Sequence, residues 1–407
     1  MGRFIVLDIV FYGGSLNYDQ GSGNYQELKK ITKWDGKQYT LVSRYALRYS
    51  LLETGKSIGL WKLVDGSNLQ RAGESDKTVI QPGISLLLSG KILEYPEFDL
   101  FGYLITNTKP QNSREAPVKI SHAISMTPFS YDNHLSGNLG YARRMVSETG
   151  KMDPNLFNIE EHETYYIYTV VIDVDRIGKN EIYLAKEVGK DGKDWKIQID
   201  GSENNYTIKI VKAKEKVIEG SYEAKTFKIK IDDGLTEEKE ASGGQVNNSP
   251  SEIDVSIKEK NGKDVHSIEY SIQHDNFRKN RVNDLVKSIL YLTRNIKAQS
   301  KDLSPKLLIV GVYKNNPYKS FKDRIRIVDE YEEEVTETHE PVVNGKKITL
   351  RVLKTRKPKF EVVSLLSDPK ELSVKGVVDQ INKIFVDDKT EVSETQIFYS
   401  PEIELKR

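Results

Sequence analysis

The chain has no cysteine and no long apolar run, and these two absences exclude several classes of protein. Without cysteine there is no disulfide framework, no thiolate metal site and no cysteine nucleophile. No stretch approaches the roughly 18 consecutive apolar residues of a transmembrane helix, so we predict no membrane span. The opening residues, MGRFIVLD, hold a short apolar run that Asp8 interrupts, so we predict no signal peptide. A reducing cytoplasm fits these features.

Common catalytic signatures are also missing. The sequence contains no phosphate-binding Walker loop, no HExxH and no GxSxG, and its six histidines lack metal-ligand spacing. We therefore predict a protein that is not an enzyme and that needs no cofactor or metal.

Charge is dense but balanced, with 61 Lys and Arg against 60 Asp and Glu. This balance excludes a uniformly basic nucleic-acid binder and leaves local basic faces open. Basic side chains gather in residues 26–62, 278–301 and 346–359, and acidic ones in residues 329–340. Charge must therefore be partitioned over the surface.

The acidic run and the last basic run flank Asn344-Gly345, a dipeptide that favours a two-residue hairpin loop. Such a loop places Glu333 opposite Arg356, so the two runs pair across neighbouring strands.

Apolar patterning predicts an α+β chain. A helix begins after an N-cap at Ser43 and is closed by Gly55. Sparse helices between strands suggest an antiparallel sheet backed by helices, as in ferredoxin-like folds. The expected buried strands are residues 4–12, 117–126, 165–174 and 307–313, and the expected helices are residues 43–54, 282–298 and 374–385.

The region around the first helix carries the strongest binding features. A glycine-rich loop at residues 13–24 precedes the helix, and Arg44 and Arg48 share one helix face. Helix N-termini attract anions, arginines hold phosphates and interleaved tyrosines stack bases. The alternatives are that the tyrosines are ordinary packing residues and that Arg48 pairs with Glu53 or Asp99.

Several motifs in order make the chain resemble the DevR-type backbone subunit of type I (I-B-like) CRISPR Cascade complexes. The motifs are GGSLNYDQG at 13–21, SRYALRY at 43–49, FDLFGY at 98–103, SHAISMTP at 121–128 and YDN at 131–133. The resemblance implies an RRM-like palm with finger insertions and a thumb hairpin. It also implies that several copies stack along one CRISPR RNA, splay single nucleotides and let the others pair with target DNA.

The broader family writes its first helix as Ser-Ser-Gln-Ala-Leu-Lys-Arg, and the basic residue contacts the RNA backbone. Ser43, Ala46, Leu47 and Arg48 match this pattern, whereas an arginine and a tyrosine replace the second and third residues. RNase-active relatives carry an aspartate in the preceding loop, and we do not carry that activity over to Asp19.

Together these considerations predict an RNA-binding set and a set of partners. The partners are CRISPR RNA, target DNA in the assembled complex, other copies of the chain, the large subunit, the subunit holding the guide 5′ end and the processing endonuclease. The predicted RNA-binding residues are Gly13, Gly14, Asn17, Ser43, Arg44, Tyr45, Arg48, His122, Arg143, Arg144, Arg278, Lys279 and Arg281.

The predicted organisation follows the chain in six segments. They are a first part of the palm at 1–60, a finger-type insertion at 61–115, palm strands at 116–178 with an RNA-facing loop at 127–158, hairpins and a flexible thumb or linker insertion at 179–275, a palm helix and strand at 276–327, and a charged hairpin with a C-terminal helix at 328–407.

Two other functions stay open from the sequence. One is a ribonuclease of the same superfamily, metal-dependent through Asp19 or dependent on His122. The other is a structural assembly protein that binds no nucleic acid.

Overall fold

The computed structural model describes most of the chain. The described residues are 2–73, 78–88, 90–106, 108, 110–152, 154–185, 187–188, 195–202, 205–212, 215–221, 226–229, 253–259, 265–272, 274–328, 335–343, 346–353, 357–363, 367–386 and 390–406. The polar segment at residues 232–252, predicted as a linker, lies outside these ranges.

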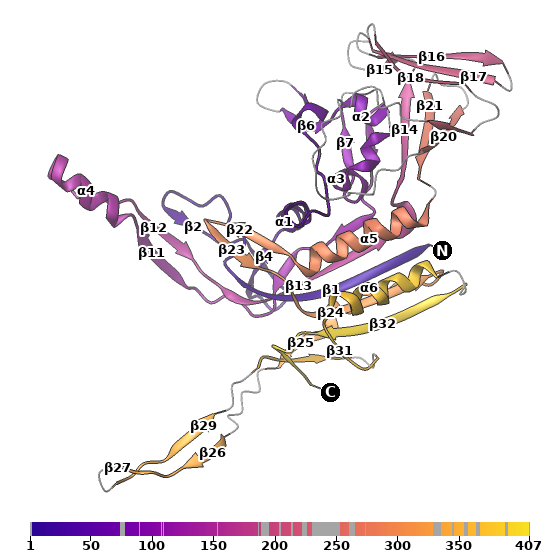
Figure 1. The fold of residues 1–407 in the computed structure, drawn as a ribbon. Helices are drawn as coiled ribbons and strands as arrows, with labels where there is room; N and C mark the ends of the chain where they lie inside the picture. The colour runs from indigo at the N-terminus through magenta and orange to yellow at the C-terminus, as the bar shows by residue number, and fades with distance from the viewer. Residues whose placement is uncertain are drawn as a thin grey trace, which may run out of the picture.

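A nine-stranded sheet, here called the palm, forms the centre of the molecule (Figure 1). Strand β1 (Arg3–Gly14) pairs antiparallel with β13 (Glu163–Asp173) on one side and β24 (Pro305–Lys314) on the other. β10 (Ala123–Ser125) lies beyond β13. Helix α1 (Arg44–Ser57) follows β1 in the chain and α5 (Asp275–Leu290) precedes β24. This order is the βαββαβ arrangement of ferredoxin-like folds, so the predicted fold class is confirmed.

Further strands widen the palm at both edges. The predicted strand over residues 117–126 is split at Ser121-His122, because the register of its pairing with β13 shifts there by one residue. All pairings in this sheet are antiparallel except that of β31 with β32. The added strands are β3 (Lys30–Thr32), β4 (Gln38–Val42), β9 (Val118–Ile120), β31 (Lys370–Glu371) and β32 (Val392–Tyr399).

Helices α1, α5 and α6 (Val374–Asn382) share one core with the palm. α6 is followed by the 3-10 turn η6 (Lys383–Phe385), in agreement with the predicted helix. Helix α1 runs past Gly55, which does not end it. A Cβ atom there would lie 2.4 Å from Cε3 of Trp61, so the glycine lets the indole pack against the helix.

The prediction of a helix over residues 282–298 is wrong at both ends. α5 begins at Asp275, and the chain after Leu290 forms the hairpin β22 (Thr293–Ile296) and β23 (Gln299–Asp302). Leu292 and Ile296 fit a helical period, but they also fit the alternation of a strand. Tertiary pairing therefore decided between two patterns that the same residues allow.

Segments from the C-terminal part cover the helix-free face of the palm. β25 (Ile325–Val328), β30 (Lys359–Val362) and β33 (Glu404–Lys406) form a small sheet there. Phe321, Phe360 and Ile403 pack against palm side chains such as Val10 and Ile167. The predicted segment 328–407 thus contributes palm strands and this cover, besides its hairpin and helix.

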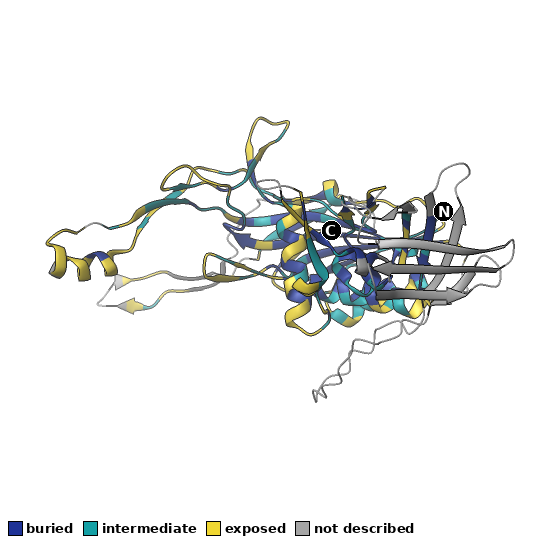
Figure 2. Cartoon of the chain, turned by 90° about the horizontal axis from the view of Figure 1, so that it is seen from above, coloured by how far each residue is buried: buried dark blue, intermediate teal, exposed yellow. Residues whose placement is uncertain are grey.

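One projecting element, here called the arm, replaces the loop predicted at residues 127–158. It consists of β11 (Asn133–Gly137), helix α4 (Leu139–Thr149) and β12 (Leu156–Glu160), with β2 (Tyr25–Gln26) paired to its base. Figure 2 shows that buried residues concentrate in the palm and that the arm is largely exposed. Asn138 caps α4 through its side chain, and Gly150 ends it in the left-handed conformation.

The charged hairpin forms as predicted near its turn. Val343 pairs with Lys346, and the register continues to Glu337 opposite Val352 before a one-residue shift at Val335. The predicted turn residues Asn344 and Gly345 lie outside the described residues, as do Glu333 and Arg356. The strands are β26 (Val335–His339), β27 (Val342–Val343), β28 (Lys346–Lys347) and β29 (Leu350–Leu353).

Two further groups of elements lie on the side of the palm that carries α1 and α5 (Figure 1). The region from 61 to 115 contains η1 (Gly66–Asn68), β5 (Leu69–Ala72), β6 (Val79–Pro82), α2 (Ile84–Leu88), η3 (Lys91–Glu94), α3 (Pro96–Asp99), β7 (Tyr103–Ile105) and β8 (Asn112–Arg114). After η4 (Val174–Arg176) come β14 (Lys179–Ala185), β15 (Glu187–Val188), β16 (Trp195–Ser202), β17 (Asn205–Lys212), β18 (Glu215–Ser221), β19 (Thr226–Ile229), β20 (Ile253–Glu259) and β21 (Val265–Ser271). No helix in the described part of the chain is long and apolar enough to cross a membrane.

Candidate nucleic-acid interface

The start of helix α1 is held by side chains from three segments. The hydroxyl oxygen of Ser43 accepts a hydrogen bond from the backbone N–H of Ala46 at 3.2 Å. Oδ1 of Asn17 accepts one from the N–H of Ser43 at 2.9 Å, and Nδ1 of His122 accepts one from the N–H of Arg44 at 3.0 Å. Three of the predicted binding residues therefore position the helix and satisfy its free donors.

Four exposed side chains follow on the outer face of α1. Arg44 and Arg48 lie one turn apart, and Tyr45 and Tyr49 are 61% and 63% exposed. Nη2 of Arg44 donates to the hydroxyl of Tyr45 at 3.0 Å, and its guanidinium carbon lies 5.0 Å from the ring centroid. This contact lowers the pKa of the Tyr45 hydroxyl. Two cations and two aromatic rings are thus displayed together, which suits phosphates and unpaired bases.

The structure does not pair Arg48 with Glu53 or Asp99. Within the described residues no carboxylate lies at ion-pair distance from Arg48, and Asp99 contacts Arg114 and Arg281 instead. The charge of Arg48 does act on Glu97, whose pKa burial raises overall. Arg48 is consequently available to a ligand.

Gly13 and Gly14 are strand residues, which corrects the prediction of a loop there. They lie at the end of β1, opposite Thr164 and Glu163, and both are buried. A Cβ at position 13 would lie 3.0 Å from Leu16, so close packing accounts for the glycine. Backbone groups of these two residues are not displayed to a phosphate.

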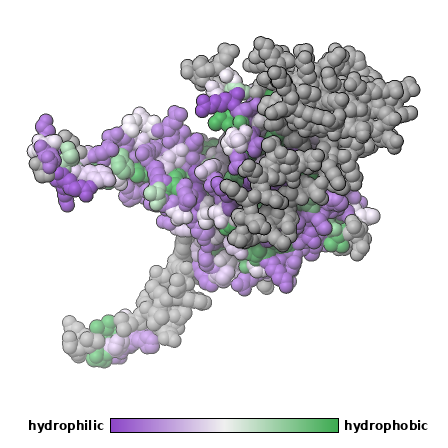
Figure 3. Space-filling view, turned by 45° about the horizontal axis from the view of Figure 1, so that its top comes forward, coloured by the Kyte–Doolittle hydropathy of each residue, from purple (hydrophilic) through white to green (hydrophobic). Residues whose placement is uncertain are grey.

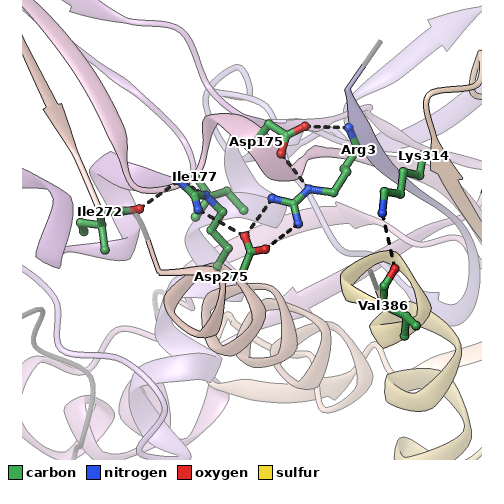
Figure 4. A network of polar contacts seen from close by, with 8 residues as sticks. Arg3, Asp175, Ile177, Ile272, Asp275, Lys314 and Val386 are labelled. Atoms are coloured by element: carbon green, nitrogen blue, oxygen red, sulfur yellow. Dashed lines mark hydrogen bonds and ion pairs between the residues drawn. The ribbon is translucent and has the colours of Figure 1, made fainter. Parts of the chain in front are cut away.

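Arg278 and Arg281 also have internal roles, which removes them from the predicted interface. They are 5% and 8% exposed. Arg278 donates to the carbonyls of Ile177 and Ile272 at 3.1 and 2.9 Å. Figure 4 shows the surrounding network, in which Arg3 binds Asp175 and Asp275.

The guanidinium of Arg281 donates to the carbonyls of Leu93 and Glu94 at 3.2 and 3.0 Å. It also lies 3.5 Å from the buried carboxylate of Asp99. Burial lowers the pKa of Arg281. The amphipathic pattern of α5 did not reveal these contacts, because the carbonyls that accept from the two arginines all belong to residues outside the helix. Lys279 is half-buried on the same helix.

Arg143 and Arg144 are exposed on α4, at the far end of the arm from the palm (Figure 1). The guanidinium of Arg144 lies over the ring of Tyr141 at 4.8 Å. The structure therefore does not bring them together with Arg44 and Arg48 around the start of α1.

The arm carries exposed apolar side chains as well. Figure 3 shows hydrophobic residues scattered among hydrophilic ones along it. The large exposed ones are Leu135, Leu139, Tyr141, Met145, Val146, Met152 and Leu156, and Tyr131 is exposed just before β11. These residues were missed at the sequence level because a loop was expected there.

The two residues of the ribonuclease alternative have ordinary contacts. Asp19 is exposed and lies 3.8 Å from Nζ of Lys29. Burial, together with the charges of Arg44 and Lys322, lowers the pKa of His122. Across the described ranges, no three His, Asp or Glu side chains are grouped so that they could hold a metal ion.

A comparison with protein families now identifies the chain. The family described as "CRISPR-associated negative auto-regulator DevR/Csa2" matches residues 5–336, from β1 through the α1 region to the hairpin. The chain belongs to this family. The resemblance predicted from the motifs is therefore confirmed, and this DevR/Csa2 protein is CRISPR-associated.

Similarity to solved structures is low. A chain titled "CRISPR RNA-guided surveillance complex, pre-nicking" is 9% identical, with 79% of this chain and 81% of that one covered and a TM-score of 0.40. A second, titled "CRISPR RNA-guided surveillance complex", is 11% identical over 90% and 91%, with a TM-score of 0.33. No curated protein matches the chain.

Proposed function

We propose that this DevR/Csa2 protein is a backbone subunit of a cytoplasmic Cascade complex and binds CRISPR RNA. Several copies coat the guide, hold its phosphates and leave most bases free to pair with target DNA. The observation that supports this is the exposed face of α1, where Arg44 and Arg48 are displayed with Tyr45 and Tyr49 and have no carboxylate partner among the described residues. Contacts of this kind hold a strand without reading its sequence, as a guide-binding subunit requires.

The arm is the element that we assign to splaying bases. The family resemblance implies a thumb hairpin, which the sequence analysis placed within residues 179–275. The arm instead combines a projecting hairpin with exposed Leu135 and Leu156, and apolar side chains of this size can wedge between bases. Its base pairs with β2, close to the segment that leads into α1.

Salt dependence of RNA binding tests the α1 face. Arg48→Ala should weaken binding to all single-stranded RNA sequences about equally and reduce the salt slope by roughly 0.7. Lys56→Ala is the matched control, because it removes an exposed charge from the last turn of the same helix. An unchanged slope for Arg48→Ala would contradict the proposal.

Co-purification tests the complex. From a host that expresses a CRISPR array, the protein should carry small RNA of uniform length and the other Cascade subunits. A protein free of nucleic acid would favour the structural-assembly alternative.

The ribonuclease alternative predicts a different result. We expect labelled RNA to stay intact with and without Mg²⁺. Cleavage by the wild type that disappears in Asp19→Ala or His122→Ala would support the ribonuclease alternative.

A further inference from the structure

A line of contacts leads from the start of α1 across the palm to the loop after β24. His122 binds the N–H of Arg44, and its neighbour Ser121 pairs with Thr169 of β13. The hydroxyl of Thr169 donates to Oδ1 of Asp8 at 2.6 Å. The α1 start and the centre of the helix-free face are thus joined through Ser121-His122.

Asp8 fastens the loop onto this face. The hydroxyl of Ser320 donates to Oδ1 of Asp8 at 2.8 Å, and the N–H of Phe321 donates to Oδ2 at 2.5 Å. Asp8 is 1% exposed, and Phe321 is buried in the core beside it. The next residue, Lys322, is therefore held in a defined place on the helix-free face of the palm.

Lys322 and Lys33 bring two more cations to this side of the palm. Lys33 belongs to the turn between β3 and β4, and its charge acts on Lys322, whereas the charges of Lys322 and Arg44 act on His122. Burial lowers the pKa of both lysines, against the opposing charges of Asp35 and Asp323 at Lys33 and of Asp323 and Asp8 at Lys322. In the described part of the chain, no carboxylate lies at ion-pair distance from Lys33 or Lys322.

Trp34 follows Lys33 and is 96% exposed. Nζ of Lys33 lies 3.8 Å from the ring centroid of Tyr39, which holds the lysine against the hairpin and leaves the indole outside. A fully exposed indole beside cations offers a stacking surface for a base, and a protein gains nothing in folding from such exposure.

We propose that Lys322, Lys33 and Trp34 extend the RNA path beyond Arg44. The two lysines hold successive phosphates, and Trp34 stacks on an unpaired base of the same single strand. This inference rests on the proposed function, because the strand is the one that the α1 face binds.

Fluorescence of the full chain tests the stacking. The sequence has three tryptophans, of which Trp61 is buried. Titration with single-stranded oligouridylate should quench the emission of the wild type, and Trp34→Phe should remove most of that quenching. Trp34→Ala should weaken binding about tenfold. Quenching that depends on protein concentration and not on RNA would assign Trp34 to contact with a second copy and overturn the proposal.

Salt dependence tests the lysines. Lys322→Ala and Lys33→Ala should each reduce the salt slope of oligouridylate binding by roughly 0.7. Lys375→Ala, an exposed charge on α6 at the helix-covered face, is the control and should leave the slope unchanged. Lys322→Gln should give the same slope as Lys322→Ala if the charge matters, and thermal unfolding of each variant checks that the fold persists.

The two proposals fail in distinguishable ways. If Arg48→Ala reduces the slope and the lysine and Trp34 variants do not, the extended path is wrong and the α1 face stands. If the wild type does not bind oligouridylate, both are overturned.

Discussion

The backbone N–H of Arg44 donates to Nδ1 of His122 at 3.0 Å, so a side chain from the palm caps helix α1 together with Ser43. Nδ1 accepts a hydrogen bond only while that nitrogen carries no proton, and in the protonated imidazolium ring both nitrogens are donors. Burial and the charges of Arg44 and Lys322 lower the pKa of His122, which favours the neutral ring in the folded protein.

Stability should therefore depend on pH through His122. As pH falls, the unfolded chain binds the proton near its ordinary pKa of about 6.5, before the folded chain does, so the free energy of unfolding decreases. We expect the wild type to lose more stability between about pH 7.5 and about pH 5.5 than His122→Asn, whose amide oxygen accepts without titrating. Urea denaturation at the two pH values measures the difference. Equal losses in both proteins would show that the cap is not coupled to protonation.

Arg281→Met should lower stability and leave the salt slope of RNA binding unchanged. The substitution removes donors from two buried carbonyls, and each unsatisfied group costs about 1–3 kcal/mol. Lys279→Ala on the same helix is the control for stability, since its side chain is only half-buried. A reduced slope in an otherwise stable Arg281→Met variant would return this residue to the interface.

Gly55→Ala should destabilise the protein even though alanine is the better helix former. The added Cβ would lie 2.4 Å from Trp61 and 2.8 Å from the hydroxyl of Ser288. Overpacking costs about 1–3 kcal/mol, against a helix gain of about 1 kcal/mol. Denaturant unfolding measures the balance, with Lys56→Ala as an exposed neighbour that should change stability by less than about 0.5 kcal/mol. A stabilised Gly55→Ala variant would mean that Trp61 can move aside.

Glu160→Gln should loosen the base of the arm. The carboxylate of Glu160 is 3% exposed and accepts from Nζ of Lys30 at 2.6 Å, the N–H of Leu28 at 2.8 Å and the hydroxyl of Tyr25 at 2.9 Å. The neutral amide leaves Lys30 without its partner, at a cost of about 3 kcal/mol. Limited proteolysis should then cut the arm faster than in Glu148→Gln, an exposed control on α4. Equal cutting would show that the ion pair does not hold the arm.

The same pair should respond to acid. Burial raises the pKa of Glu160, but the hydrogen bonds from Lys30, Leu28 and Tyr25 outweigh it and hold the pKa below its ordinary value. Its contribution to stability is present above about pH 4.5 and is lost as pH falls through the folded pKa. Unfolding curves of the wild type and Glu160→Gln should therefore converge as the solution is acidified, and parallel curves would contradict this.

Local pattern alone determined the strands at the centre of the palm and the start of α1. The run over residues 4–12 is almost entirely apolar, so it is buried in any fold that the chain adopts. Ser43 caps α1 by accepting from the N–H of Ala46, only three residues away in the chain. The Asn344-Gly345 dipeptide is likewise a local sequence signal, and the pairing of Val343 with Lys346 agrees with it. Helical spacing also predicted that Arg44 and Arg48 lie together, because side chains four residues apart share one face of a helix.

Tertiary contacts decided the rest, because they join residues far apart in the chain. Arg48 is exposed, whereas Arg281 is buried. Arg281 donates to the carbonyls of Leu93 and Glu94 and lies beside the carboxylate of Asp99. Gly13 turned out to be a strand residue because it pairs with Thr164 of β13, which is distant in the chain. Sequence spacing records the period of one element, and it holds no information on which other element supplies a partner.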